Sequence, residues 1–277
     1  MSRIGPCFER LQRDGRTALI PYITAGDPEP KVTVPLMHSM VEAGADIIEL
    51  GVPFSDPMAE GPIIQHACER ALRHHTSLNQ VMEMVKAFRA DDDTTPVVLM
   101  GYLNPVEVKG YEAFAQDAAS VGVDGVIIVD LPPEEAGEYV AFLNAQQIDP
   151  VFLLAPTSGD ERIHKICATS GGFVYYVSLR GVTGAAHLDT QEAAAKVEII
   201  RRATKLPVGV GFGISDAQSA AQVAQFADAV IVGSAIVKRI AARVDATDKI
   251  NAEVSGFLKE LRHALDDITT DQAVTTA

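Results

Sequence analysis

Short apolar segments recur along most of the chain, separated by longer segments with helical character. Most of the apolar segments are continuous rather than alternating, which is typical of parallel strands covered on both faces. Successive segments start roughly 20–35 residues apart, the length of a strand followed by a helix. The predicted strands are Leu19–Thr24, Asp46–Leu50, Val97–Gly101, Gly125–Asp130, Val151–Ala155, Phe173–Ser178, Val208–Gly213 and Ala227–Gly233.

Eight such units without a domain-sized linker predict a single (β/α)8 barrel, or TIM barrel, of the α/β class. A doubly wound open sheet is the alternative, although such sheets usually have fewer strands. Ser2–Arg13 is predicted as an extra N-terminal helix that covers the bottom of the barrel. The long interval after the second strand predicts an inserted helix at Ile63–Arg73, before the helix at Leu78–Ala90. We expect one domain over residues 1–267, and a polar, disordered tail over 268–277.

Composition narrows the class of protein further. The chain has 277 residues, 47% of them hydrophobic, and a formal charge of −14, which disfavours binding to nucleic acid or anionic membranes. No apolar run approaches the roughly 18 residues of a membrane span, and the charged N-terminus does not resemble a signal peptide. Its three cysteines, Cys7, Cys68 and Cys167, are widely separated and predict neither disulfides nor a zinc site. We therefore expect a cytoplasmic protein.

Glycine-rich turns follow the seventh and eighth predicted strands, where phosphate sites recur in barrels. Gly213 allows a ligand to approach the backbone, and Gly233-Ser234 opens a short helix whose free amides favour an anion. The loop at 178–187 contains further glycines and resembles a lid, in which Gly184 offers an amide to the phosphate and Thr183 a hydroxyl to a catalytic group. Ordinary turns and a plain flexible loop are the alternatives.

Carboxyl groups at other strand ends are candidates for acid–base catalysis. Glu49 lies inside a predicted strand, where burial raises the pKa of a carboxyl group, unless it is a satisfied structural group. Asp130 ends the fourth predicted strand and is a second candidate. Because Leu131-Pro132-Pro133 follows it, the alternative is that Asp130 only shapes the turn. In the proline-rich loop after the second strand, Glu60 can accept a proton from a ligand N–H, and Asp56 can face a partner.

Aromatic residues at strand ends predict a pocket for a flat apolar ring, with a capped core as the alternative. Tyr22, Tyr102 and Phe212 occupy such positions, and only one of Tyr175 and Tyr176 can face the interior. The predicted strand ends contain no lysine and no cluster of histidines, which disfavours an imine-forming aldolase and a histidine-ligated metal. The residues thus indicate acid–base chemistry on a phosphorylated small molecule, without a metal, and leave the substrate open.

Eight sequence blocks in order resemble the α subunits of tryptophan synthase, from about residue 5 to residue 265. The eight blocks are PYITAGDP (21–28), GADIIELGVPFSDPMAEGPIIQ (44–65), MGYLNPV (100–106), GVDGVIIVDLPPEE (122–135), LLAPTS (153–158), YYVSLRGVTG (175–184), GFGIS (211–215) and ADAVIVGSAIV (227–237). The run ELGVPFSDP (49–57), within the second block, is the most specific part of the resemblance.

This resemblance implies a retro-aldol cleavage of indole-3-glycerol phosphate into indole and glyceraldehyde 3-phosphate. It implies that Glu49 is the general acid–base and that Tyr175 lies near the reacting side chain. The second carboxylate of the family, which holds the indole N–H, is normally an aspartate, and here it is Glu60. The extra methylene keeps the acceptor and moves it by about one bond length.

The resemblance also assigns binding residues. It implies phosphate contacts at Gly184, Gly213, Gly233 and Ser234. It implies an indole pocket lined by Tyr22, Met100, Ile127 and Phe212. Thr183 matches the lid residue that contacts the catalytic carboxylates.

A β subunit that contains pyridoxal phosphate is the implied partner, in an α2β2 heterotetramer, so this chain itself is expected to need no cofactor. The residues implied to face β are Asp56, Asn104, Pro105 and Pro132. Two other hypotheses remain open: a stand-alone lyase that releases indole without β, and a non-catalytic barrel that binds a phosphorylated ligand. Other phosphate-binding barrels, such as indole-glycerol-phosphate synthase or phosphoribosylanthranilate isomerase, lack the ELGVPFSDP run.

Overall fold

The computed structural model describes residues 2–177, 190–211 and 213–275, with side chains described up to residue 268. One sheet of parallel strands forms the centre, in the order β5-β4-β3-β2-β1-β9-β8-β7-β6. The strands are β1 (Ala18–Thr24), β2 (Ile48–Gly51), β3 (Val97–Gly101), β4 (Gly125–Ile128), β5 (Asp149–Pro150), β6 (Leu153–Leu154), β7 (Val174–Val177), β8 (Val208–Gly211) and β9 (Ala229–Val232).

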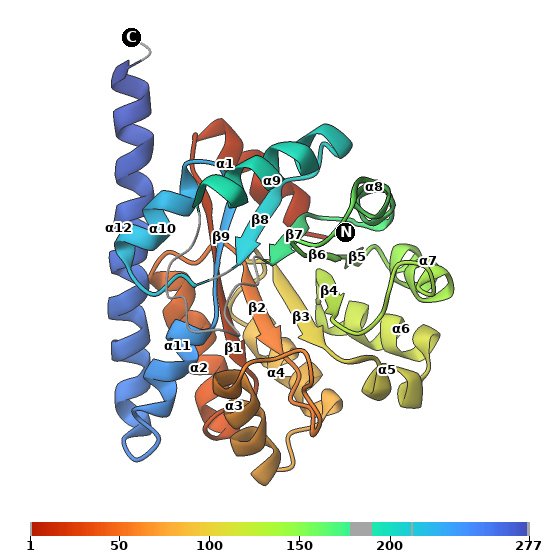
Figure 1. The fold of residues 1–277 in the computed structure, drawn as a ribbon. Coiled ribbons are helices and arrows are strands. Elements are labelled where there is room, and N and C mark those ends of the chain that lie inside the picture. Colours follow the sequence, from red (N-terminus) through yellow and green to blue (C-terminus); the bar gives the residue numbers. More distant parts are fainter. Residues whose placement is uncertain (1, 178–189, 212, 276–277) are drawn as a thin grey trace.

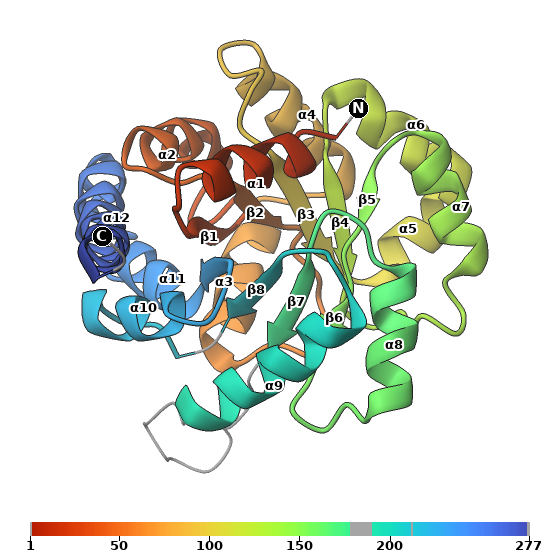
Figure 2. The ribbon, with the colours of Figure 1, turned by 90° about the horizontal axis from the view of Figure 1, so that it is seen from above.

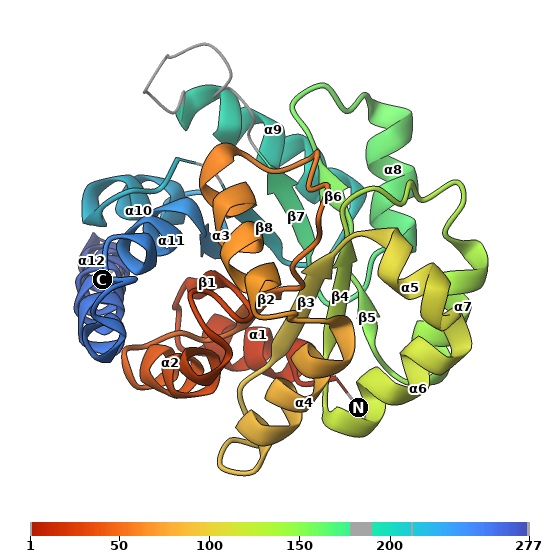
Figure 3. The ribbon, with the colours of Figure 1, turned by 90° about the horizontal axis from the view of Figure 1, so that it is seen from below.

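The predicted barrel is confirmed, with one difference in its fifth strand. This strand divides into β5 and β6, which are separated by Val151 and Phe152. β5 pairs with β4, while β6 pairs with β7. β5 and β6 lie only two residues apart in the chain, yet they form the two ends of the sheet order. This segment therefore closes the sheet into the ring seen in Figure 2 and Figure 3. An open doubly wound sheet is thereby excluded.

Helices surround the ring as expected for alternating units (Figure 1). The predicted inserted helix after β2 is confirmed as α3 (Pro62–Arg73), and α4 (Leu78–Arg89) follows it. The remaining outer helices are α2 (Pro30–Glu42), α5 (Leu103–Lys109), α6 (Tyr111–Val121), α7 (Gly137–Ala145), α8 (Asp160–Thr169), α9 (Thr190–Ala203), α10 (Ala217–Ala224), α11 (Ser234–Ala241), the 3-10 helix η1 (Thr247–Lys249) and α12 (Ile250–Thr275).

Alternation along each strand divides the core into two parts. Residues such as Leu19 and Val174 point outward and pack under the helices. Their neighbours Ile20 and Phe173 point into the barrel, where they pack against α1 (Ile4–Arg13). The predicted N-terminal helix therefore lies across the bottom of the barrel, as Figure 2 shows, and closes it with a buried apolar face.

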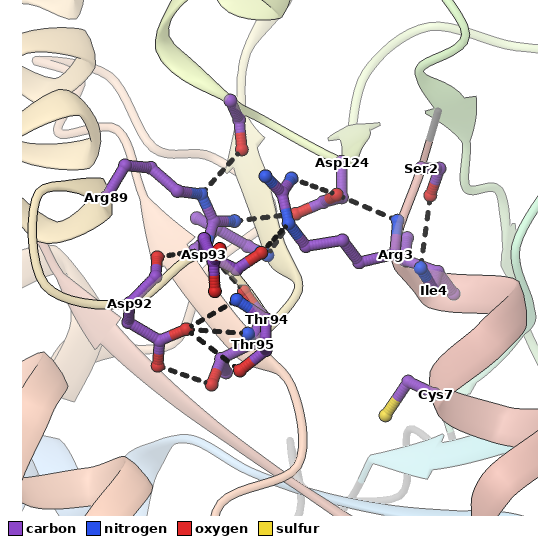
Figure 4. Close-up of polar contacts among 12 residues, drawn as sticks. Ser2, Arg3, Ile4, Cys7, Arg89, Asp92, Asp93, Thr94, Thr95 and Asp124 are labelled. Carbon is purple, nitrogen blue, oxygen red and sulfur yellow. Dashed lines mark hydrogen bonds and ion pairs between the residues drawn. The ribbon is translucent and has the colours of Figure 1, made fainter.

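Aspartates at the start of strands fasten the bottom of the barrel to the preceding strand. The Asp124 carboxylate accepts hydrogen bonds from the Val97 N–H at 2.8 Å, from Arg89 at 2.7 Å and from Arg3 at 2.9 Å, as Figure 4 shows for the two arginines. Asp46 and Asp228 accept in the same way from the amides of Leu19 and Val208, at 2.9 and 2.8 Å. Each aspartate also donates its backbone N–H to the backbone carbonyl of the residue whose amide its carboxylate accepts: Asp124 to Val97, Asp46 to Leu19 and Asp228 to Val208. The paired bonds fix the register at this end.

α12 stands along one side of the barrel, beside α10, α2 and α11 (Figure 1). Its Arg262 is buried and bonds the Asp46 carboxylate at 3.1 Å and the Thr17 carbonyl at 3.0 Å. The helix continues through Thr275, so the backbone is helical where the sequence predicts a disordered tail; a domain end at Asp267 stays a prediction. Within the described ranges, no helix is both long and apolar enough to cross a bilayer.

Candidate active site

The chemically distinctive residues gather at the carboxyl ends of the strands, opposite α1. α3 and the loop that precedes it lie across this end (Figure 3). Two interior positions here carry no side chain, Gly51 at the end of β2 and Gly211 at the end of β8. The hydroxyl of Tyr22 occupies the space beside Gly51, and that of Tyr175 the space beside Gly211, each where a Cβ would otherwise be. The two glycines therefore make room for two tyrosines within the mouth of the barrel.

Glu49 is the buried carboxyl group of the site. It lies in β2, is 1% exposed, and pairs in register with Tyr22 of β1. Its Oε2 atom has no hydrogen-bond partner among the described residues. Burial, and then the nearby charge of Glu60, raise the pKa of Glu49 to about 8, so it holds a proton at neutral pH. A buried carboxyl oxygen at a barrel mouth, without a partner in the described part of the chain, is suited to exchange a proton with a ligand.

Glu60 lies in loop 2, the segment 52–61 between β2 and α3, and is half-buried. Its N–H donates to the Pro57 carbonyl at 3.0 Å, and its own carbonyl accepts from Gln65 at 2.8 Å. Desolvation raises the pKa of Glu60 to about 7. The loop thus brings a second carboxyl group close enough to Glu49 for the charge of Glu60 to raise the pKa of Glu49.

An apolar wall with tyrosine hydroxyls surrounds the two carboxyl groups. Tyr22 is buried against Ala67, Val237 and the partly buried Met100, while its hydroxyl shares a hydrogen bond of 3.1 Å with Thr24. Ile127 lies deeper, in the interior cluster with Tyr175 at its edge. Burial raises the pKa of Tyr175 well above its ordinary value, as do the charges of Glu49 and Glu60. Both tyrosines are therefore neutral at physiological pH.

Glycines border the opposite side of this mouth. Gly213 has φ +58°, in the left-handed region that favours glycine. Apart from its chain neighbours, no atom of the described residues lies within 4 Å of the place where a Cβ would be. α11 begins at Ser234 with Gly233 as its N-cap, as the sequence predicts for this Gly-Ser pair. Among the described residues no side chain caps this helix, so its first amides have no side-chain partner there, and Ser234 is exposed. Gly184, Thr183 and Phe212, also predicted here, lie outside the described residues.

Asp130 is the acid–base candidate that the structure moves out of the site. β4 ends at Ile128, so Asp130 falls in the following turn, is exposed, and accepts the Leu103 N–H at 2.8 Å. It fixes the start of α5, which agrees with the alternative that Asp130 only shapes a turn. The predicted strand end at Asp130 was wrong, because β4 ends at Ile128. Tyr176 points outward into the helix-covered core, which confirms that only one tyrosine of this pair faces the interior. Over the described ranges, no three metal-ligating side chains come together.

The residues predicted to face a partner occupy the surface around loop 2 and α5. Asp56 and Asn104 are exposed, and Pro105 and Pro132 are partly exposed. Two large apolar side chains lie on the same two segments: Met58 of loop 2 is 86% exposed and Val108 of α5 is 90% exposed. Both side chains therefore lie on segments that carry residues predicted to face a partner.

Sequence reasoning missed residues whose side chains support the site from behind. Thr24 shares the Tyr22 hydroxyl, and the sulfur of buried Cys68 accepts a hydrogen bond from the backbone of Phe54. Tyr102 was predicted to line a ring pocket, but its ring stacks on Phe54 of loop 2 at 5.0 Å. The sequence does indicate the contact of Thr24: it lies two residues after Tyr22 in β1, and residues two apart in a strand face the same side. The contacts of Cys68 and Tyr102 have no such signal, because they join segments that are not neighbours in the sequence pattern; for Tyr102 the sequence indicates only a strand end.

Comparisons with known proteins place this geometry among relatives. The family model described as "Tryptophan synthase alpha chain" matches residues 8–266. A tryptophan synthase alpha chain of Thioalkalivibrio sulfidiphilus is 64% identical over 96% of this chain and all of that protein, and one of Nitrosococcus oceani is 59% identical over 96% and 98%. The crystal structure of tryptophan synthase subunit alpha from Legionella pneumophila superposes with a TM-score of 0.91 at 46% identity, covering 96% of this chain and 99% of that one.

Proposed function

The chain belongs to the family of tryptophan synthase alpha chains, and on this premise we propose which of its residues perform the reaction and with what partner. The chain is a lyase. It cleaves indole-3-glycerol phosphate into indole and glyceraldehyde 3-phosphate by a retro-aldol reaction. Such a reaction needs a proton donor at the ring carbon and a proton acceptor at the side-chain hydroxyl.

Glu49 supplies both functions in turn. Its carboxyl group gives a proton to the indole carbon that bears the glyceryl side chain, which makes the ring a leaving group. As the carbon–carbon bond breaks, its electron pair returns to the ring and the neighbouring hydroxyl loses its proton, forming the aldehyde. Glu49 accepts that proton and is regenerated. A pKa of about 8 keeps the group protonated at neutral pH, as the first step requires.

Glu60 accepts a hydrogen bond from the indole N–H and stabilises the positive charge that develops on the protonated ring. Tyr175 contacts the reacting side chain. Tyr22, Met100, Ile127 and Phe212 form the walls that hold the flat ring. This division of roles agrees with a half-buried carboxyl group in loop 2 beside an apolar interior.

The substrate phosphate binds at the glycine side of the mouth. The amides of Gly213 and Gly233 and the hydroxyl and amide of Ser234 bind it, aided by the N-terminal end of α11. Backbone amides suit this task in a chain of net charge −14, because they attract the anion locally. Gly184 and Thr183 belong to the lid that closes over the bound substrate.

The partner is a tryptophan synthase β subunit, to which indole passes within an α2β2 heterotetramer in the cytoplasm. The surface with Asp56, Asn104, Pro105 and Pro132 contacts it, and the exposed side chains of Met58 and Val108 favour this assignment. Pyridoxal phosphate belongs to the β subunit, and this chain contributes acid–base chemistry alone. Passage of indole to a partner gives a reason why two apolar side chains stay exposed beside the mouth.

The buried, protonated Glu49 beside Glu60 carries the proposal. The test is indole release from indole-3-glycerol phosphate by the purified chain, alone and with a β subunit. We expect slow release that rises sharply with β. We expect Glu49→Gln to lower the rate by several orders of magnitude with binding of a substrate analogue retained, because glutamine has similar size and cannot exchange the proton. Glu260→Gln, on the exposed face of α12, is the matched control and should be unchanged.

Three results would count against this proposal. Unchanged turnover in Glu49→Gln would remove this residue from the mechanism. Fast release by the chain alone, with no increase on addition of β, would identify a stand-alone lyase. No release under either condition would favour the non-catalytic barrel and would first implicate Glu60.

A further inference from the structure

Loop 2 presents Glu60 from a segment that is mostly in contact with solvent. Ser55, Asp56, Met58 and Ala59 are all exposed. A loop of this kind has little apolar burial of its own to fix its position. The location of the Glu60 carboxyl group therefore depends on a few contacts between the loop and the barrel.

Tyr102 makes contact with both arms of this loop. It follows β3, is 5% exposed, and stacks its ring on Phe54 with centroids 5.0 Å apart and planes 24° apart. Its hydroxyl accepts a hydrogen bond of 2.9 Å from the N–H of Ala59, the residue next to Glu60. One buried side chain thus joins the start of the loop to its end.

The other contacts hold one arm each. The sulfur of Cys68 accepts from the backbone of Phe54, and Gln65 donates to the Glu60 carbonyl at 2.8 Å. Both partners belong to α3, the helix that directly continues the loop. Tyr102 belongs to a different barrel unit. The Val52 N–H also ties the start of the loop to β3, donating to the Met100 carbonyl at 2.8 Å, whereas Tyr102 fixes the end of the loop, beside Glu60, against the strands that carry the ring pocket.

We propose that Tyr102 is the positioning residue of the reaction: through its hydroxyl and the Ala59 amide it holds Glu60 at the indole nitrogen. The proposal rests on the role of Glu60 given above. Tyr102 does not touch the substrate. It also directly precedes α5, whose Asn104 and Pro105 lie on the proposed partner surface, so one residue joins that surface to the second carboxyl group.

Tyr102→Phe tests this by removing only the hydroxyl and keeping the ring on Phe54. We expect kcat with a β subunit present to fall about tenfold while KM changes little, because a displacement of about 1 Å can cost roughly a hundredfold and a loop still held by the Phe54 stacking should move by less. The acid limb of the pH profile should move to lower pH, because a released loop exposes Glu60 to water and lowers its pKa. Tyr139→Phe is the control: it removes another buried hydroxyl, from α7, which has no hydrogen-bond partner in the described part of the chain.

A double-mutant cycle with Glu60→Gln separates positioning from general damage. If Tyr102 acts through Glu60, Tyr102→Phe has little further effect in the Glu60→Gln background. A tenfold loss that persists in the Glu60→Gln background would overturn the role of Tyr102 and leave that of Glu60 intact. The same conclusion would follow if Tyr102→Phe kept the original kcat and pH profile while Glu60→Gln was slow. A Glu60→Gln enzyme with unchanged rate and pH profile would refute the role of Glu60 itself, and the proposal with it. Unfolding midpoints of all variants should agree within about 2 °C.

Discussion

At the scale of single residues, two carboxyl groups share one site and need opposite protonation states. Burial raises the pKa of Glu49 to about 8 and that of Glu60 to about 7. Glu49 must be protonated to act as the acid, and Glu60 must be ionised to accept from the indole N–H and oppose the ring's positive charge. The larger burial of Glu49, helped by the charge of its neighbour, sets the two values in the order that this division of roles requires.

This order predicts a bell-shaped dependence of kcat/KM on pH, measured from about pH 5.5 to 9.5. As pH rises through about 7, Glu60 ionises and the rate increases; as pH rises through about 8, Glu49 loses its proton and the rate falls. In Glu60→Gln the acid limb should disappear. The alkaline limb should then move to lower pH, because the charge that raises the pKa of Glu49 is gone. An acid limb that survives in this variant would assign it to another group.

At the scale of elements, the proposed phosphate site at the start of α11 relies on backbone amides rather than on a basic side chain. It starts at Ser234, its N-cap Gly233 lies beside the Tyr22 ring, and no side chain satisfies its first amides. Amides and helix dipole favour negative charge at this end. A capping carboxylate would compete with the phosphate for the same groups.

Gly233→Asp should therefore raise KM for indole-3-glycerol phosphate more than about tenfold and leave kcat nearly unchanged, because phosphate binding contributes equally to the ground and transition states. Gly233→Ala is the matched control. Its Cβ would lie 3.5 Å from the Tyr22 ring, an ordinary contact, so we expect a KM within about twofold of the original. Steady-state kinetics decide the matter, and equal KM values for the two variants would place the phosphate elsewhere.

At the scale of the whole molecule, the two ends of the barrel serve different purposes. The carboxyl ends carry partly unsatisfied groups, such as Glu49 Oε2 and the first amides of α11. The opposite end is closed by α1 and by buried aspartates that accept backbone amides and arginines. Rigidity at the bottom allows the mouth to keep polar groups free for a ligand.

Asp124→Ala should accordingly lower the free energy of unfolding by about 3 kcal/mol or more, because it leaves the buried Arg89 and the Val97 N–H without their partner. Glu253→Ala removes an ion pair of similar length, 2.9 Å to Arg243, from a more exposed place. It should cost less than about 1 kcal/mol. Urea denaturation measures both, and similar losses would contradict a special role for the bottom of the barrel.

The sequence by itself determined the barrel, its inserted helix and the segment that carries each proposed site residue. Continuous apolar runs at regular spacing already specify strands covered on both faces, and glycines at strand ends mark where a ligand approaches. These are local properties, because they depend on residues a few positions apart. Glu49 was recognisable for the same reason, because a carboxyl group inside an apolar run is buried when that run forms a strand.

Only the tertiary structure decided the contacts between units. It divided the fifth strand at Val151 and Phe152, ended β4 before Asp130, and continued α12 through Thr275. It also placed Tyr102 against loop 2 and the tyrosine hydroxyls beside Gly51 and Gly211. Hydrogen bonds between distant segments end a strand or fix a loop, and their partners come together only when the barrel closes. The order of the pKa values of Glu49 and Glu60 follows from the same closure, because burial sets it.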